Sequence, residues 1–224
     1  MPTQLPLARH LDGLRTAMVA FVRYADRAGL DALVPTCPGW TVRDLVAYQG
    51  AAHRATAAML RGGGPVPPEP MVGDPLEWLR DGAIDLVEAI TRAPQEFWAR
   101  RACHQTTLRA VDALAAVFGR VPDPAETWIE VDLAVDGIDE QLTGFATRPT
   151  STLRSDQEGV LVVAPHDVPD WWLVRVGPGP AGAVRGSGPL PDLPAADWEL
   201  TGSAVGLYLA LWDRSAGPGL PRSA

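Results

Sequence analysis

The chain has 224 residues, of which 46% are hydrophobic and 21% charged, and its formal net charge is -8 at pH 7. This length suits one large domain or two small ones, and the hydrophobic content is ordinary for a folded globular protein. The acidic balance argues against a nucleic-acid partner, because phosphate binding requires clustered basic side chains. All 19 basic residues are Arg, and they form no basic stripe.

The two cysteines, Cys37 and Cys103, lie far apart in the sequence and form no CxxC pair. No stretch resembles a secretory signal, and no apolar run is long enough to cross a bilayer. We therefore expect a reduced, cytoplasmic setting and no membrane partner.

Helical periodicity dominates the first two thirds of the chain. Apolar residues recur at steps of three and four, and caps or breakers such as Gly29 and the Asp74-Pro75 pair separate the segments. This pattern predicts helices over residues 7–28, 41–61, 75–93, 96–118 and 125–145. The fourth segment has two adjacent apolar stripes, which is typical of a helical bundle. The acidic run within residues 130–140 is interpreted as a solvated helix face.

The second predicted helix carries the first candidate for chemistry. Thr41 followed three residues later by Asp44 is a variant of the capping box that starts a helix. His53 shares the apolar face of this helix, so we expect its side chain to point into the interior. An inward histidine in a bundle is a candidate metal ligand.

The pattern changes to extended segments in the last third of the chain. Residues 146–155 are rich in Ser and Thr and are interpreted as the connection between two domains. Short strands are predicted over residues 159–164, 171–176, 183–185 and 197–200, followed by a helix over 204–213 that Ser203 caps. These elements predict a small α+β module in which one helix covers a sheet.

Several blocks of the sequence resemble the mycothiol-dependent maleylpyruvate isomerase family. The most diagnostic is Thr36-Cys37-Pro38-Gly39-Trp40-Thr41-Val42-Arg43-Asp44, followed by Gly50-Ala51-Ala52-His53-Arg54. Further blocks begin at Phe97, Ala134 and Leu200 in the family's order, so the resemblance covers nearly the whole chain. It implies a DinB-like four-helix bundle over residues 1–146 and a small α+β domain over residues 147–224.

The resemblance also implies a metal site and a thiol cofactor. In the family, a divalent metal, usually zinc, is held by a histidine at the position of His53 and by a glutamate and a histidine four residues apart on a later helix. Three such ligands leave an open coordination position, and a metal-bound thiol loses its proton. Mycothiol would thereby become a nucleophile toward an electrophilic substrate.

This chain departs from that pattern at two of the three ligand positions. Gln105 stands where the family has glutamate, and Arg109 stands where it has the second histidine. Glutamine is a weak oxygen donor for zinc, and arginine has no lone pair to offer. We therefore expect the zinc or other divalent metal site to be lost, with His53 retained as a core histidine that pairs with Gln105.

The remaining candidates keep alternative interpretations open. His104 is interpreted as a packing or hydrogen-bonding residue, and a rebuilt site of His53, His104 and Asp112 is disfavoured because residues 104 and 112 lie beyond the reach of one helical turn. Cys37 is either a thiolate favoured by a helix start or a small apolar filler. An inward Arg109 needs a carboxylate, for which Asp112, Asp136 and Glu140 are candidates.

Two functions remain open at this stage. The first is a mycothiol-dependent isomerase or thiol transferase with an impaired metal centre, in which His53 and Arg109 are the catalytic candidates and Gln105, His104 and Asp112 line the pocket. The second is a catalytically inactive protein of the same fold that binds a small molecule. In both cases we expect a small thiol or anionic ligand as partner, and a monomer or homodimer.

Overall fold

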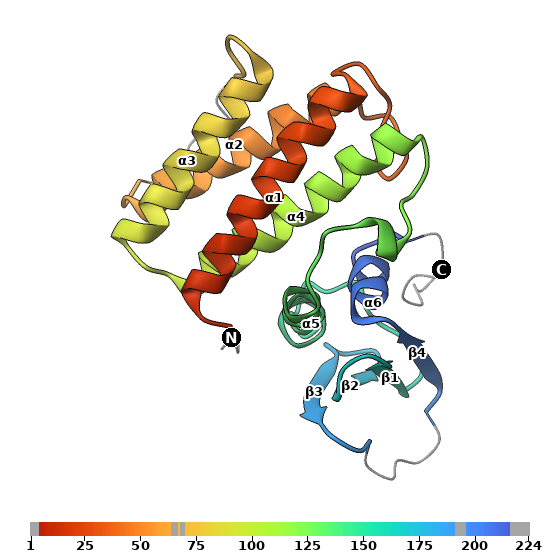
Figure 1. Cartoon of the computed structure of the whole chain (residues 1–224). Coiled ribbons are helices and arrows are strands. Elements are labelled where there is room, and N and C mark those ends of the chain that lie inside the picture. Colours follow the sequence, from red (N-terminus) through yellow and green to blue (C-terminus); the bar gives the residue numbers. More distant parts are fainter. Residues whose placement is uncertain (1–4, 64–66, 68–69, 191–195, 216–224) are drawn as a thin grey trace. The chain divides into compact units, whose positions relative to one another are not determined.

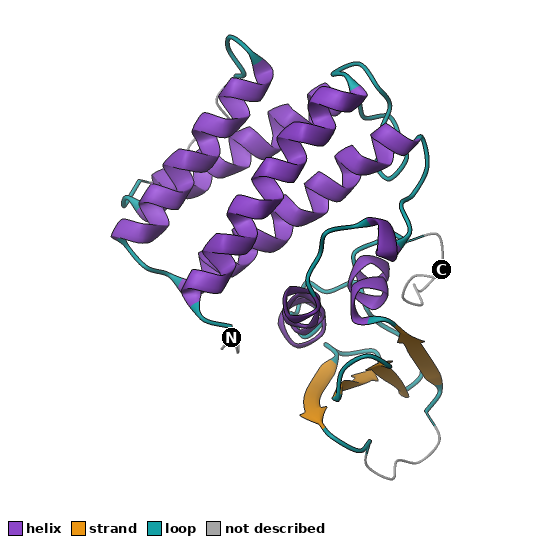
Figure 2. Ribbon diagram, viewed as in Figure 1, coloured by secondary structure: helices purple, strands orange, loops and turns teal. Residues whose placement is uncertain are grey.

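The computed structural model describes residues 5–63, 67, 70–190 and 196–215, and the chain divides into two compact units, residues 2–122 and 123–224 (Figure 1). The first unit contains helices alone, whereas the second combines helices with a sheet (Figure 2). The α+β fold class predicted from the sequence is thereby confirmed. Each unit is described separately below.

The first unit consists of four helices: α1 (Leu7–Ala28), α2 (Val42–Leu60), α3 (Pro75–Arg92) and α4 (Glu96–Phe118). The predicted bounds agree with these to within one residue at each end. Helix α1 packs mainly on α4, and α2 packs mainly on α3. The apolar faces that periodicity predicted form the core, where Leu14, Phe21 and Leu79 are fully buried.

Two helix starts in this unit have the caps that the sequence predicts. The Thr41 hydroxyl accepts a hydrogen bond from the Asp44 backbone N–H, and the Asp44 carboxylate accepts one from the Thr41 backbone N–H at 2.8 Å. At the start of α3, the Asp74 carboxylate accepts from the backbone N–H groups of residues 76 and 77. These bonds satisfy donors that a helix leaves unpaired in its first turn.

The second unit begins with η1 (Pro124–Glu126), a single 3-10 turn, followed by α5 (Val131–Asp139) and the π-helical turn η2 (Glu140–Phe145). The continuous helix predicted over 125–145 is therefore wrong at its start. Asp123 and Glu126 cap each other across the single turn, and Thr127 then adopts an extended backbone, so helical geometry stops before Val131. Helix α5 packs on α6 and η2 contacts β3, which groups residues 123–146 with the sheet.

The sheet has four strands: β1 (Gly159–Pro165), β2 (Asp170–Val176), β3 (Gly182–Ser187) and β4 (Trp198–Gly202). Their order is β3-β2-β1-β4, with β4 parallel to β1 and the other neighbours antiparallel. Helix α6 (Ala204–Leu211) follows β4, and the Ser203 hydroxyl caps it, as predicted. Two parallel strands need a long connection between them. Here the segment that contains β2 and β3 connects β1 to its parallel neighbour β4.

One acidic residue of α5 is buried for a specific reason. The indole Nε1–H of Trp172, a fully buried side chain of β2, donates to Asp139 Oδ1 at 3.1 Å. Asp139 is only 6% exposed, and Asp136 and Glu140 are buried as well, so the interpretation of the acidic run as a solvated face is wrong at these three positions. Only the first acidic residues of the run, Glu130 and Asp132, are exposed. A buried indole N–H needs an acceptor, and the carboxylate supplies it.

Among the described residues, no helix combines the length and the apolar character that a membrane span requires.

Candidate functional site

The loop between α1 and α2 presents the diagnostic block of the sequence to α4. It folds back on itself through backbone bonds between Val34 and Trp40 at 2.9 Å and from Trp40 N–H to the Cys37 carbonyl at 3.0 Å. Gly39 has a φ of 81°, a backbone conformation that favours glycine. The turn that Pro38 and Gly39 predict therefore holds the side chains of the block in fixed positions.

Asp112 of α4 is the centre of a first polar cluster, which we call the Arg109 cluster: Thr36, Cys37, Arg109 and Asp112. The Thr36 hydroxyl donates to Asp112 Oδ1 at 2.6 Å, and the Cys37 thiol donates to Oδ2 at 3.5 Å. Arg109 Nη1 donates to the same Oδ2 at 2.8 Å. Asp112 is fully buried, and three side chains thus compensate its charge and its lone pairs.

The carboxylate partner expected for Arg109 is therefore Asp112, one of the three candidates. The pair is three residues apart on α4, the spacing at which helical side chains meet. Arg109 Nη1 also lies 3.4 Å from the Cys37 sulphur. Cys37 thus sits between a guanidinium and a carboxylate, and its thiol is a hydrogen-bond donor here rather than an apolar filler.

Arg109, like Thr36 and Cys37, is only half-buried, and aromatic rings lie beside its guanidinium. Its guanidinium carbon lies 4.9 Å from the centre of the Tyr48 ring and 5.6 Å from that of Trp40, within the range of cation–π attraction. The two rings contact each other edge to face at 5.4 Å. The Arg109 side chain remains 18% exposed, so a cation that Asp112 holds in place lies beside two aromatic rings and is partly open to solvent. Such a niche suits a small anion with a planar or unsaturated body.

His53 belongs to a second, closed cluster, the His53 network: Gln49, His53 and Thr106. His53 Nε2 lies 2.8 Å from Gln49 Nε2 and 2.9 Å from Thr106 Oγ1. The amide of Gln49 also donates to the Thr106 hydroxyl at 3.2 Å. The expectation that His53 pairs with Gln105 is wrong, because residues 49 and 106 provide its contacts and Gln105 is the half-buried neighbour on α4.

Burial decides the charge of His53. Desolvation lowers its pKa from 6.5 to about 3, with a smaller contribution from the positive charge of Arg54. The ring is therefore neutral, and because an amide N–H can only donate, Nε2 accepts and the ring proton lies on Nδ1. His53 Nδ1 and Gln49 Oε1 have no hydrogen-bond partner within the described part of the chain.

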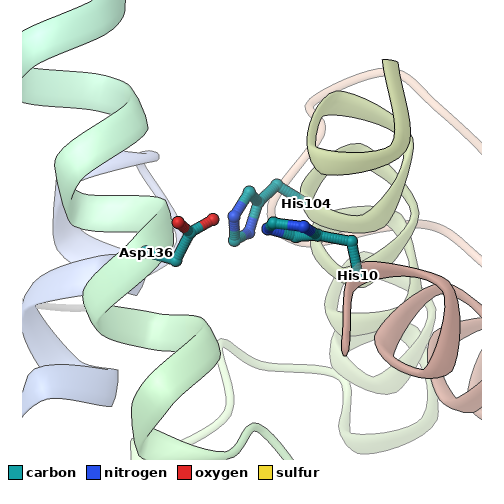
Figure 3. Close-up of side chains that lie close together, drawn as sticks. All are labelled: His10, His104 and Asp136. Carbon is teal, nitrogen blue, oxygen red and sulfur yellow. The ribbon is translucent and has the colours of Figure 1, made fainter. Parts of the chain in front are cut away.

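His104, on the same helix, has a different neighbour. Figure 3 shows its ring close to that of His10 from α1. The two ring centres are 6.3 Å apart at an interplanar angle of 76°, and both residues are buried. His104 is thus buried with its ring edge-to-face against that of His10.

The structure keeps the three members of the hypothetical rebuilt site apart. His53 contacts Gln49 and Thr106, Asp112 binds the Arg109 cluster, and His104 pairs with His10. They occupy three separate environments within the bundle.

The residues at the family's ligand positions do not fit a divalent metal. The guanidinium of Arg109 is a fixed positive charge that would repel a dication, and its carboxylate partner is already saturated. The acceptor nitrogen of His53 is engaged by Gln49 and Thr106, and its other ring nitrogen carries the proton. Gln105 alone offers a neutral oxygen, a poor ligand for zinc.

Sequence reasoning missed three members of these clusters, Thr36, Gln49 and Thr106, and also missed the Tyr48 ring beside Arg109. Thr36 lies in the diagnostic block, but its contact with Asp112 spans 76 residues. Gln49 stands four residues before His53, a spacing that could have suggested the pair. Thr106 follows Gln105 directly, so a rotation of α4 by one residue decides which of the two faces His53.

Comparisons with known proteins agree with this architecture. Two solved structures, the mycothiol-dependent maleylpyruvate isomerase and a histidine-to-alanine mutant of it, align over 100% of this chain and 99% of theirs. The TM-scores are 0.54 and 0.58, and the sequence identities are 16% and 15%, respectively, so the likeness is one of fold. No match was found among curated proteins.

The comparison with protein families concerns the sequence itself. Residues 11–134, more than half of the chain, match the family described as "Mycothiol maleylpyruvate isomerase N-terminal domain". The match contains the diagnostic block, the His53 network and the Arg109 cluster. The chain therefore belongs to the mycothiol maleylpyruvate isomerase N-terminal domain family.

Proposed function

We propose that this protein is a metal-independent member of its family, an isomerase or thiol transferase that acts on a small electrophile bearing a carboxylate, with mycothiol as the thiol. The proposal includes a cytoplasmic setting, because mycothiol chemistry requires a reduced thiol. Its site is the Arg109 cluster with the rings of Trp40 and Tyr48.

The observation that carries the proposal is the position of the Arg109 guanidinium. The buried carboxylate of Asp112 holds it at 2.8 Å, the rings of Trp40 and Tyr48 lie beside it, and its side chain is 18% exposed. Arginine forms paired hydrogen bonds with carboxylates, and a guanidinium fixed in advance loses little freedom when it binds one. The cation can orient the substrate and stabilise negative charge that develops on it when a thiol adds to its double bond.

The decisive experiment compares variants of Arg109 in an assay of maleylpyruvate isomerisation with mycothiol. Arg109→Met removes the charge at similar length and should abolish turnover, while Arg109→Lys should retain part of it because the charge persists without the paired geometry. Arg92→Met, at an exposed position, is the matched control. Turnover by the wild-type protein should survive a chelator. Turnover that depends on added zinc, and that His53→Ala abolishes together with zinc binding, would refute metal independence.

A second candidate function is supported by the state of the possible proton acceptors. His53 is closed off with a pKa of about 3, and both oxygens of Asp112 already accept hydrogen bonds. A protein with an anion niche but without a general base would bind a small carboxylate and not convert it. Calorimetric binding of maleate that Arg109→Met abolishes, in a protein without thiol-dependent turnover, would favour this inactive binding protein over the enzyme.

A further inference from the structure

A long apolar groove runs between α1 and α3, away from both polar clusters. It encloses about 720 Å³, and residues of these two helices alone line it. Its floor includes Leu14, Met18 and Ala83. The groove exists because α1 packs chiefly on α4 while α3 packs chiefly on α2, which leaves the facing sides of α1 and α3 only partly covered.

Large apolar side chains stand exposed along this groove. Val19 of α1 is 71% exposed and Ile84 of α3 is 59% exposed, and Val22 and Val87 are half-buried beside them. Scattered exposed apolar residues are ordinary, but a continuous apolar groove with two of them at its centre is typical of an interaction surface.

The charged residues at the ends of the groove follow a specific order. On α1, Arg15 lies at one end and Asp26 at the other, 11 residues apart, or about 16 Å along the helix. On α3, Arg80 and Glu88 are 8 residues apart, or about 12 Å. A further cation, Arg23, lines the groove near Asp26, and its guanidinium donates to the Tyr24 hydroxyl at 2.8 Å. Apart from Arg23, each helix presents a cation at one end, an anion at the other and apolar residues between them.

We propose that the groove is the interface of a homodimer, in which a second copy of the chain packs with a two-fold axis perpendicular to the helices. This axis places α1 antiparallel to α1 of the second copy and α3 antiparallel to its α3. Arg15 then faces Asp26 of the second copy, and Arg80 faces its Glu88. Ile84, midway between residues 80 and 88, meets its own counterpart on the axis.

The same axis pairs the apolar residues of α1. The midpoint between Arg15 and Asp26 is also the midpoint between Val19 and Val22. Val19 of one copy therefore faces Val22 of the other. The charge pairs and the apolar pairs on each helix therefore share one centre. A surface that complements itself in this way matches a second copy better than a partner of a single charge sign, such as an acidic helix or an anionic membrane.

Existing ion pairs do not compete strongly with this arrangement. Arg15 contacts Asp12 at 2.8 Å and Glu88 contacts Arg92 at 3.0 Å, and the side chains of both pairs are more than half exposed. Exposed pairs within one helix contribute little, so these groups can turn to a partner across the interface.

Sedimentation of the full chain tests the proposal, with Ile84→Glu and Val19→Glu as the disrupting variants. The wild type should sediment as a dimer at micromolar concentration, and Ile84→Glu should weaken the dimer by more than about tenfold because two like charges meet on the axis. Leu33→Glu is the matched control, since Leu33 is 71% exposed, as Val19 is, but lies outside the groove. Circular dichroism checks that each exposed-site variant remains folded.

Charge exchange tests the predicted register separately. Arg15→Glu alone should weaken the dimer, because it faces Asp26, and adding Asp26→Arg should restore it. Ile84→Cys should form an intermolecular disulfide under mild oxidation, whereas the wild type with Cys37 and Cys103 should not. A monomeric wild type, a dimer unaffected by Ile84→Glu, or capture by anionic vesicles without dimerisation would overturn the proposal.

Discussion

The Arg109 cluster and the His53 network both take residues from α4, yet they differ in charge and in exposure. The Arg109 cluster holds an ion pair whose cation is 18% exposed, while the His53 network contains neutral groups and is closed to solvent. In the family's pattern, residues at these positions would share one metal. Here Arg109 is a fixed cation paired with Asp112, and His53 is a buried member of a hydrogen-bonded network, so these two positions lie in one charged and one neutral environment.

This difference predicts that the Arg109 cluster is the more sensitive to loss of one member. Asp112→Ala removes the only carboxylate of the cluster and leaves the inner side of Arg109 and the donors of Thr36 and Cys37 without an acceptor. Breaking a buried pair in this way costs about 3–5 kcal/mol. Urea unfolding should show this loss, while Asp12→Ala, which removes an exposed partner of Arg15, should change stability little. Equal effects of the two variants would contradict the assignment of Asp112 as the centre of the cluster.

The His53 network should make the stability of the protein depend on pH. The folded-state pKa of about 3 lies below the ordinary value of 6.5, so the unfolded chain takes up a proton first as the pH falls. Stability is therefore highest above pH 6.5 and decreases toward pH 3, by about 2 kcal/mol between pH 6.5 and 5 for this group alone.

Unfolding measured over this pH range in wild type and His53→Gln isolates the contribution of His53. The variant should lose much of the pH dependence, whereas His166→Gln, at an exposed histidine of the second unit, should retain it. Retention of the full slope in His53→Gln would show that His53 is not the neutral histidine described here.

How well the sequence predicts these regions depends on how far apart in the chain the interacting residues lie. Helix bounds and the Thr41 cap depend on residues within a few positions of each other, and periodicity or spacing predicts them. For Arg109 the sequence offers three carboxylates, and the structure selects Asp112, three residues away on the same helix. The contact of Thr36 with Asp112 joins residues in different elements, and no local pattern indicates it. The same applies to His10 beside His104.

Two errors show the complementary limit. The sequence pattern predicts Gln105 beside His53, but Thr106 takes that place, because the facing residue depends on how α4 is rotated against α2. The pattern also predicts a helix that starts at residue 125, but the residues after Asp123 form only one capped turn before α5 begins at Val131. Helical periodicity does not distinguish Gln105 from Thr106 as the neighbour of His53, and the packing of α4 against α2 decides between them. Periodicity also does not show that the capped turn after Asp123 ends before the helix begins.

A smaller effect is expected when the polar network around His53 loses one group. Thr106→Val keeps the shape of the side chain but removes the hydroxyl that contacts both His53 and Gln49. The loss of a buried hydrogen-bond partner costs about 1–3 kcal/mol. Thermal unfolding measures it, and Thr91→Val, at an exposed position of α3 where the hydroxyl bonds only a backbone carbonyl, is the matched control.

The smallest effect concerns Cys37 and sharpens the distinction between a reactive thiolate and a structural thiol. Its sulphur lies 3.5 Å from Asp112 Oδ2 and 3.4 Å from Arg109 Nη1, so the neutral thiol donates to one while the sulphur accepts from the other. Serine can make both contacts, so Cys37→Ser should change stability by less than about 1 kcal/mol, and Cys37→Ala should cost more. Alkylation at neutral pH should be slow, because the S–H group is engaged in the hydrogen bond to Asp112 Oδ2. Rapid alkylation of Cys37, with a thiol-dependent activity that Cys37→Ser abolishes, would instead assign the nucleophile to the chain itself.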